Sequence, residues 1–106
     1  MIDTALRAVA DPTRRTILRL VRDTERPAGE IAGYFPTISR PAVSRHLRLL
    51  KRAGLVVEKP RGTRRIYQLH DQGVEAVREY VERVWGEAAT RFRLVARNTP
   101  SEPPER

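Results

Sequence analysis

The sequence predicts a mainly α domain with one small β-hairpin, in the order helix, helix, helix, helix, strand, strand, helix. Apolar residues recur every three or four positions through most of the chain, which is the period of amphipathic helices. The exception is residues 55–69, where two strand-like runs flank a turn that contains Pro60 and Gly62. The length of 106 residues is that of a single domain.

The first two helices are separated by a capping signal. Residues 2–9 place three apolar side chains on one helical face: Ile2, Leu6 and Val9. Asp11 is a strong N-cap, and Pro12 suits the first helical position, where an N–H would have no partner. We therefore expect the second helix over about residues 12–21.

A third helix and a tight turn come next. Residues 27–34 have the apolar spacing of a short helix. Pro36 disfavours helical geometry at the residue before it, so residues 35–38 are expected to form a turn.

The fourth helix has clear signals at both ends. Ser39 is a preferred N-cap, Pro41 is tolerated in a first turn, and Gly54 suits the left-handed position after a last turn. The helix should span about residues 40–53, with a buried stripe of Val43, Leu47 and Leu50.

The hairpin and a long last helix complete the domain. Residues 55–58 and 64–69 are predicted strands around a turn at residues 59–63. Asp71 is expected to cap the last helix, whose apolar residues repeat at heptad-like spacings: Val74, Val77, Val81, Val84 and Ala88. This pattern favours pairing with another helix, and Trp85 extends the apolar surface.

The sequence divides into a domain and a tail. Residues 1–97 carry the predicted helices and strands and form one expected domain. Residues 98–106 are polar and rich in proline, so we expect a disordered tail.

Positive charge is concentrated in one quarter of the chain. Residues 40–65 hold nine Lys or Arg residues and one acid, Glu58, whereas the other residues hold twelve of each sign. Concentrated positive charge repels itself and weakens a fold unless a polyanion is the partner. The alternative is a solvated basic face that serves solubility.

The predicted elements place this charge on a helix-turn-helix followed by a wing. Because the first turns of such a helix reach base edges in the major groove, Arg40, Ser44 and Arg45 are candidate base contacts, and Pro41 could touch a thymine methyl. The Ser39 hydroxyl is better suited to capping than to base contact. Phosphate contacts are expected farther along the helix and in the wing, from Arg48, Lys51, Arg52, Arg61, Arg64 and Arg65.

His46 has two interpretations. It lies between the buried stripe and the exposed face of the helix, so it is either a DNA contact, which we favour, or a half-buried packing residue.

Three motifs resemble the arsenic-repressor type of winged-helix regulators, the ArsR/SmtB family. They are DPTRRTIL (11–18), SRPAVSRHLRLLKRAGLV (39–56) and GTRRIYQL (62–69). The resemblance implies a winged helix-turn-helix with a recognition helix at 39–53 and a wing at 56–68. It also implies a homodimer built from the first and last helices, which binds inverted repeats in promoters. Most such regulators are repressors released by an inducer, although activation is compatible with the sequence.

The dimer contacts expected from this resemblance lie on two helices. The first helix offers Ile2, Leu6 and Val9, and the last helix offers Val74, Val77, Val81, Val84, Trp85 and Ala88. The valine spacing supports pairing of the last helix independently of the resemblance.

The sequence departs from the family at its sensor sites. Metal-sensing members often carry a Cys-x-Cys pair where this chain has Pro27 and Gly29, neither of which has a metal-binding side chain. His70 and Asp71 remain candidate ligands for a divalent ion such as nickel or zinc. We otherwise expect no cofactor, and neither an effector nor a co-regulator protein is specified by the sequence.

Other classes of protein fit less well. The chain has no cysteine, no apolar run of membrane-spanning length and no signal-peptide pattern, so we expect a cytoplasmic protein without a membrane partner. We find no nucleophile–base pair and no Gly-rich phosphate loop, and therefore do not expect an enzyme. The alternatives are a non-specific nucleoid-type or RNA-binding protein and a protein-interaction module that uses Trp85 and the valine seam.

Overall fold

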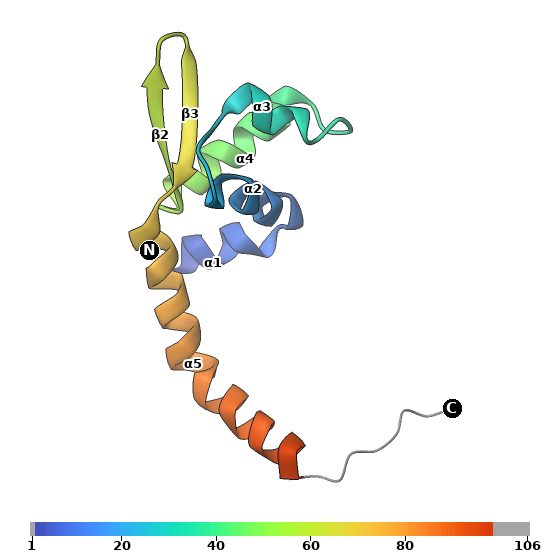
Figure 1. The fold of residues 1–106 in the computed structure, drawn as a ribbon, viewed down its shortest axis with the longest axis vertical. Helices are drawn as coiled ribbons and strands as arrows, with labels where there is room; N and C mark the ends of the chain where they lie inside the picture. The colour runs from blue at the N-terminus through green and yellow to red at the C-terminus, as the bar shows by residue number, and fades with distance from the viewer. Residues whose placement is uncertain (1, 99–106) are drawn as a thin grey trace, which may run out of the picture.

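The computed structural model describes the backbone of residues 2–98 and the side chains of residues 2–86, 88 and 91. Its elements are α1 (Ile2–Ala10), α2 (Pro12–Arg22), β1 (Arg26–Pro27), α3 (Ala28–Gly33), α4 (Arg40–Arg52), β2 (Val56–Arg61), β3 (Arg64–Leu69) and α5 (Asp71–Asn98). The predicted order of helices and strands is confirmed, with β1 as an addition. The β2–β3 wing projects from one end of the body, and α5 extends away at the other (Figure 1).

The core is built where four helices meet the sheet. Its fully buried large side chains include Ile17 of α2, Ile31 of α3, and Leu47 and Leu50 of α4. Each stabilises the fold by roughly 1.5–3 kcal/mol relative to an exposed position. Because α4 buries its apolar stripe against α2 and the sheet, its opposite face is fixed toward solvent.

Both ends of α4 follow the predicted chemistry. The Ser39 Oγ accepts a hydrogen bond from the Ala42 backbone N–H at 3.2 Å, so Ser39 is the N-cap. After the last turn Gly54 has a φ of 80°, a left-handed conformation that glycine adopts without strain. The Leu55 N–H donates to the Leu50 carbonyl and the Gly54 N–H to the Lys51 carbonyl, which completes a Schellman motif.

The sheet corrects two expectations from the sequence. Residues 26 and 27 form the short strand β1, which pairs with β3, so α3 begins at Ala28 and not at Pro27. The strand β2 continues through Pro60 to Arg61, so the turn is only the two residues Gly62 and Thr63. Both β1 and β2 are edge strands, where a proline leaves no hydrogen bond of the ladder unmade.

The start of α5 is fitted closely to the end of α4. The His70 carbonyl accepts from the Val74 N–H, so His70 precedes the helix and Asp71 is its first residue, not its cap. A Cβ atom at Gly73 would lie 1.8 Å from the Gly54 carbonyl oxygen, an approach that only glycine permits. This contact sets the direction in which α5 leaves the body.

The predicted tail lies almost wholly outside the described residues. Asn98, which we assigned to the tail, is the last residue of α5, and residues 99–106 are not described. In the part of the chain that the structure describes, no helix is long and apolar enough to cross a membrane.

Candidate nucleic-acid interface

The exposed face of α4 carries most of the candidate DNA contacts. Its exposed residues are Arg40, Pro41, Ser44, Arg45, Arg48, Lys51 and Arg52. They lie opposite the buried Val43, Leu47 and Leu50, as the apolar spacing predicts. The N-terminal half of this face is available to reach into a groove of DNA.

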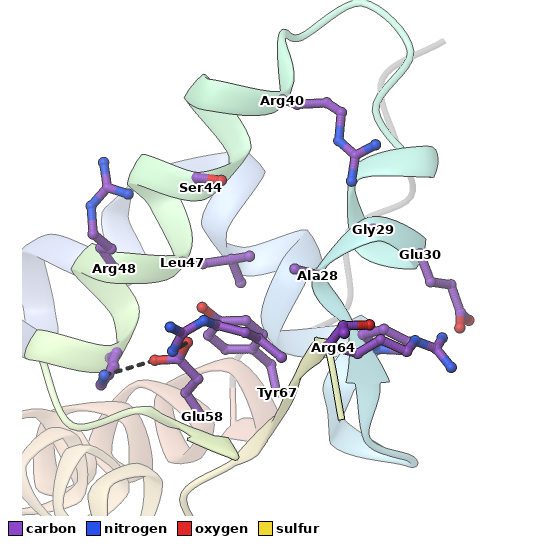
Figure 2. Close-up of a pocket in the computed structure, with 14 residues that line it drawn as sticks. Ala28, Gly29, Glu30, Arg40, Ser44, Leu47, Arg48, Glu58, Arg64 and Tyr67 are labelled. Atoms are coloured by element: carbon purple, nitrogen blue, oxygen red, sulfur yellow. Dashed lines mark hydrogen bonds and ion pairs between the residues drawn. The ribbon is translucent and has the colours of Figure 1, made fainter. Parts of the chain in front are cut away.

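A groove of about 930 Å³ separates α4 from the wing and from α3. Ser44, Arg48 and Lys51 line it from α4, and Arg64 and Arg65 line it from the wing. Figure 2 shows the Arg40 side chain extending from the start of α4 toward α3. The recognition helix and the wing therefore border one continuous basic concavity.

Glycine at position 29 makes room for Arg40 at the edge of this groove. A Cβ atom there would lie 3.1 Å from an Arg40 guanidinium nitrogen. Metal-sensing proteins of the ArsR/SmtB type often carry a cysteine at the position of Gly29. In this chain the Arg40 side chain lies against that position instead.

Three of the candidate cations are held by carboxylates. Glu58 of β2 accepts hydrogen bonds from Lys51 Nζ at 2.7 Å and from an Arg65 guanidinium nitrogen at 2.6 Å. Glu25, which precedes β1, accepts from Arg61 near the tip of the wing at 2.6 Å. The contact with Glu25 was not predictable from the sequence, because 36 residues separate the partners.

The other basic residues of this region have no ion pair with any carboxylate of the described side chains. They are Arg40, Arg45, Arg48, Arg52, Lys59 and Arg64. Because no carboxylate among the described side chains neutralises them, these six side chains are the ones most ready to pair with phosphates or guanine.

His46 faces the interior side of α4. It is half-buried, and its Nδ1 lies 3.1 Å from a guanidinium nitrogen of Arg14 on α2. The Arg14 Nε also donates to the Ala8 carbonyl at the end of α1, at 2.8 Å. His46 is therefore part of a link between three helices, which supports the packing interpretation. The DNA contact that we favoured stays a prediction.

The sequence also missed the anchoring role of Arg26. Its Nε donates to the Leu20 carbonyl at 2.6 Å, its guanidinium pairs with Glu30, and it lies 5.5 Å from the centre of the Tyr34 ring. These contacts fix α3 to the end of α2. No helical or strand period reveals such a residue, since its partners are set by the tertiary fold.

The two candidate metal ligands lie side by side in the chain, just before and at the start of α5. The Nδ1 of His70 lies 2.9 Å from the Gly54 carbonyl oxygen, and Asp71 is exposed at the first turn of α5. Among the side chains that the structure describes, no group of three or more His, Cys, Asp or Glu residues could hold a metal ion.

The valine seam of α5 divides into two parts. Val74 and Val77 pack against the core, whereas Val81, Val84 and Trp85 are 38%, 45% and 52% exposed and Ala88 is also exposed. On α1, which contacts α5, Ile2, Leu6 and Val9 are half-buried. Apolar residues thus continue along α5 past the edge of the body.

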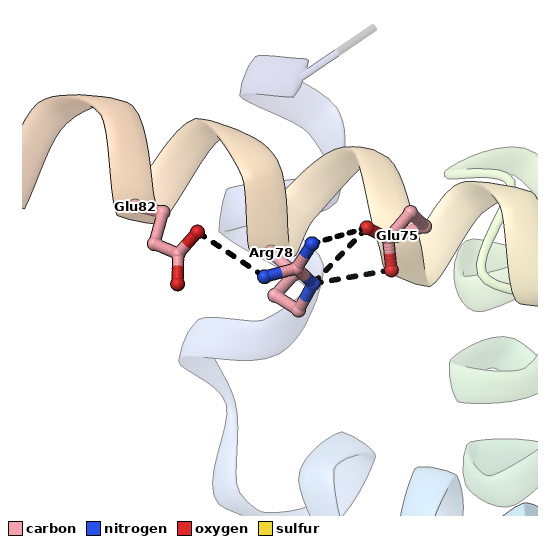
Figure 3. A network of polar contacts seen from close by, with 3 residues as sticks. All are labelled: Glu75, Arg78 and Glu82. Atoms are coloured by element: carbon pink, nitrogen blue, oxygen red, sulfur yellow. Dashed lines mark hydrogen bonds and ion pairs between the residues drawn. The ribbon is translucent and has the colours of Figure 1, made fainter. Parts of the chain in front are cut away.

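Polar residues flank this seam. Arg78 pairs with Glu75 and Glu82 along α5 (Figure 3). The first of these partners holds the pKa of Arg78 above its ordinary value. Such pairs between residues three and four apart favour the helix and solubility.

Comparisons with known proteins agree with this architecture. A family model described as a helix-turn-helix domain matches residues 9–59. The chain is 46% identical over 90 residues to the HTH-type transcriptional regulator Rv2034 of Mycobacterium tuberculosis, a match that covers 85% of this chain and 83% of the relative. It is 38% identical to the transcriptional repressor SdpR of Bacillus subtilis, over 65% of this chain and 76% of that protein.

Solved structures show the same fold. A possible transcriptional regulator for arsenical resistance has a TM-score of 0.75 and 38% identity, over 89% of this chain and 95% of that chain. An ArsR-like transcriptional regulator from Rhodococcus sp. has a TM-score of 0.70 and 25% identity, over 95% and 94%. The fold and the basic helix with its wing define a winged helix-turn-helix DNA-binding protein. The chain belongs to the ArsR/SmtB family of transcriptional regulators.

Proposed function

We propose that this regulator binds, as a homodimer, an inverted-repeat site in a promoter and represses transcription there. The observation that carries the proposal is the row of α4 cations that have no carboxylate partner among the described side chains. Two of them, Arg40 and Arg48, line the same groove as the wing. Arg40, Ser44 and Arg45 are the proposed base contacts. Arg48, Arg52 and Arg64 are the proposed phosphate contacts.

The proposed dimer is supported by the exposed part of the α5 seam. Val81, Val84 and Trp85 would be covered by the same residues of a second copy, because a twofold axis places each patch against itself. The half-buried apolar residues of α1 would join this interface through the contact of α1 with α5.

Repression is the proposed mode of regulation. Repression is supported by two relatives that are named repressors, SdpR and SmtB. The proposal assigns no resident metal, and release from DNA would depend on an effector or on a partner protein. The protein would act in the cytoplasm, where the bacterial chromosome lies.

Competition binding tests the proposal. A labelled duplex from the region upstream of the protein's own gene is displaced by unlabelled duplex of the same sequence or of a shuffled sequence, at ~0.15 M salt. We expect the promoter duplex to bind on the order of a thousandfold or more tightly than the shuffled duplex. Equal affinities would instead indicate a packaging protein, which needs only phosphate contacts.

A further inference from the structure

Glu58 is the one acidic residue within the basic region, and it lies inside the proposed DNA groove. It lines the groove with Lys51 and Arg65, and Figure 2 shows it between α4 and the wing, beside Tyr67. A negative charge in such a place repels phosphate, so general attraction of DNA does not explain its presence.

The contacts of Glu58 show what the carboxylate does in the free protein. Its two oxygens are divided between two elements: one accepts from Lys51 of α4 and the other from Arg65 of β3. Across the ladder Glu58 is opposite Tyr67, which places Arg65 at the diagonal position on the same face of the hairpin. The carboxylate therefore joins the recognition helix to the wing.

The Glu58 carboxylate is well suited to remain charged. Its side chain is only 9% exposed, whereas Lys51 and Arg65 are 55% and 67% exposed. The hydrogen bond from Lys51, followed by the contact with Arg65, holds the pKa of Glu58 below its ordinary value. Burial, followed by the charge of the same carboxylate, raises the pKa of Tyr67, so Glu58 stays ionised and Tyr67 stays neutral at neutral pH.

The consequence concerns which DNA is bound. Lys51 and Arg65 are flexible side chains that would otherwise extend to phosphates of any duplex. While they are tied to Glu58 they are partly neutralised and held in one arrangement. Phosphate contact is independent of DNA sequence. When two cations are withheld from phosphates, the base contacts therefore contribute a larger share of the binding free energy.

We propose that Glu58 is a positioning residue that sets sequence specificity, because it withholds Lys51 and Arg65 from indiscriminate phosphate contact and fixes the wing relative to α4. This inference rests on the proposed function, since specificity has meaning only for a regulator that prefers its own site.

The test is Glu58→Gln in the protein as it exists, with binding to a random duplex measured over a range of salt concentrations. The variant frees both cations and removes the negative charge. We expect the slope of log K against log salt to steepen by about one to two units per protomer, because each of the two freed cations can gain a phosphate contact that contributes about 0.9. At ~0.1 M salt each gained contact raises the affinity for the random duplex about eightfold.

The promoter duplex supplies the second readout. The gain there should be smaller, because the cations lose the arrangement that fits the site, so the preference for the promoter duplex should fall about tenfold. Glu58→Asp keeps the charge and should keep a slope close to that of the unaltered protein. Glu75→Gln removes the same charge from α5, away from the groove, and should change neither slope nor preference.

A second pair of variants keeps the test decisive if Glu58→Gln does not fold. Lys51→Met removes a cation that Glu58 holds, and Arg64→Met removes one without a carboxylate partner among the described residues. On random duplex, Arg64→Met should make the slope shallower by about one unit and Lys51→Met by less than half of that.

The proposal would be overturned by two results: an unchanged slope and preference in folded Glu58→Gln, or equal slope losses in Lys51→Met and Arg64→Met. The random-duplex measurements need no operator. If the unaltered protein showed no preference for its promoter region, the proposed function would fail while the withholding of the two cations could still be measured.

Discussion

At the scale of single residues, Asp11 shows how one side chain fixes a helix start. Its carboxylate accepts from the Arg14 backbone N–H at 3.0 Å, and this bond, the largest cause, lowers the pKa of Asp11 below its ordinary value of 3.8. Asp11 therefore contributes stability above about pH 4, and the contribution is lost as pH falls through the lowered pKa.

We accordingly predict that Asp11→Ala lowers the free energy of unfolding by ~1 kcal/mol at pH 7, as loss of an N-cap does. Urea unfolding at pH 7 and at pH 3 measures this, and the difference between the variant and the unaltered protein should shrink at pH 3. Asp23→Ala is the control, because that exposed residue follows α2 and caps no N-terminus. A variant as stable as the unaltered protein at pH 7 would contradict the capping role.

Arg45 tests the assignment of base contacts. It is exposed in the first half of α4 and has no ion pair among the described side chains. We predict that Arg45→Ala weakens binding to the promoter duplex by ~1–3 kcal/mol more than binding to a shuffled duplex, as the loss of a bidentate contact with guanine would. Competition binding measures both, with exposed Arg83→Ala of α5 as the control; equal losses on the two duplexes would make Arg45 a phosphate contact.

Single residues were predictable where local chemistry decides their role. The caps at Asp11 and Ser39 and the exposure of Arg45 follow from residue type and helical period. The contact of His46 with Arg14 could not be predicted, because Arg14 lies 32 positions away in the sequence. The pairing of Glu58 with Lys51 and Arg65 depends likewise on the register of the hairpin against α4.

At the scale of elements, the wing provides the second half of the groove. Arg64 follows the two-residue turn and has no carboxylate partner among the described residues, unlike Arg61 and Arg65. Gly62 has a φ of 64°, as the first position of such a tight hairpin turn requires. The turn thus presents Arg64 at the tip of the wing.

We predict that Arg64→Ala lowers affinity for all duplexes by a similar factor and makes the salt slope shallower by about one unit per protomer. Filter binding or fluorescence anisotropy at several salt concentrations provides the slopes. An unchanged slope would remove the tip of the wing from the interface.

The bounds of elements followed the sequence wherever a period was long enough to detect. The helix α4 begins at the predicted residue and ends one residue early, and β3 has the predicted bounds. The two-residue strand β1 was not predicted, because it is a strand only through its pairing with β3. The extension of β2 through Pro60 was not predicted for a related reason. A proline is compatible with a strand mainly at the edge of a sheet, and which strands lie at an edge is decided only when the sheet assembles.

At the scale of the whole molecule, the long axis of 59 Å reflects an α5 that extends away from the body (Figure 1). We predict that Val81→Glu converts the dimer to a monomer, because the symmetric seam would place each new charge beside its own copy. Sedimentation measures the mass, and Gln72→Glu adds the same charge off the seam as a control. A Val81→Glu protein that stays dimeric would place the interface elsewhere.

We propose that the α4 helices and wings of the two protomers bind the same face of a DNA site with twofold symmetry. Hydroxyl-radical footprinting of the protein on the region upstream of its own gene tests this most directly. We expect two symmetric protected patches whose centres are one helical turn, about 34–36 Å, or a whole multiple of it apart. Uniform protection along the duplex, or a single patch without symmetry, would contradict it.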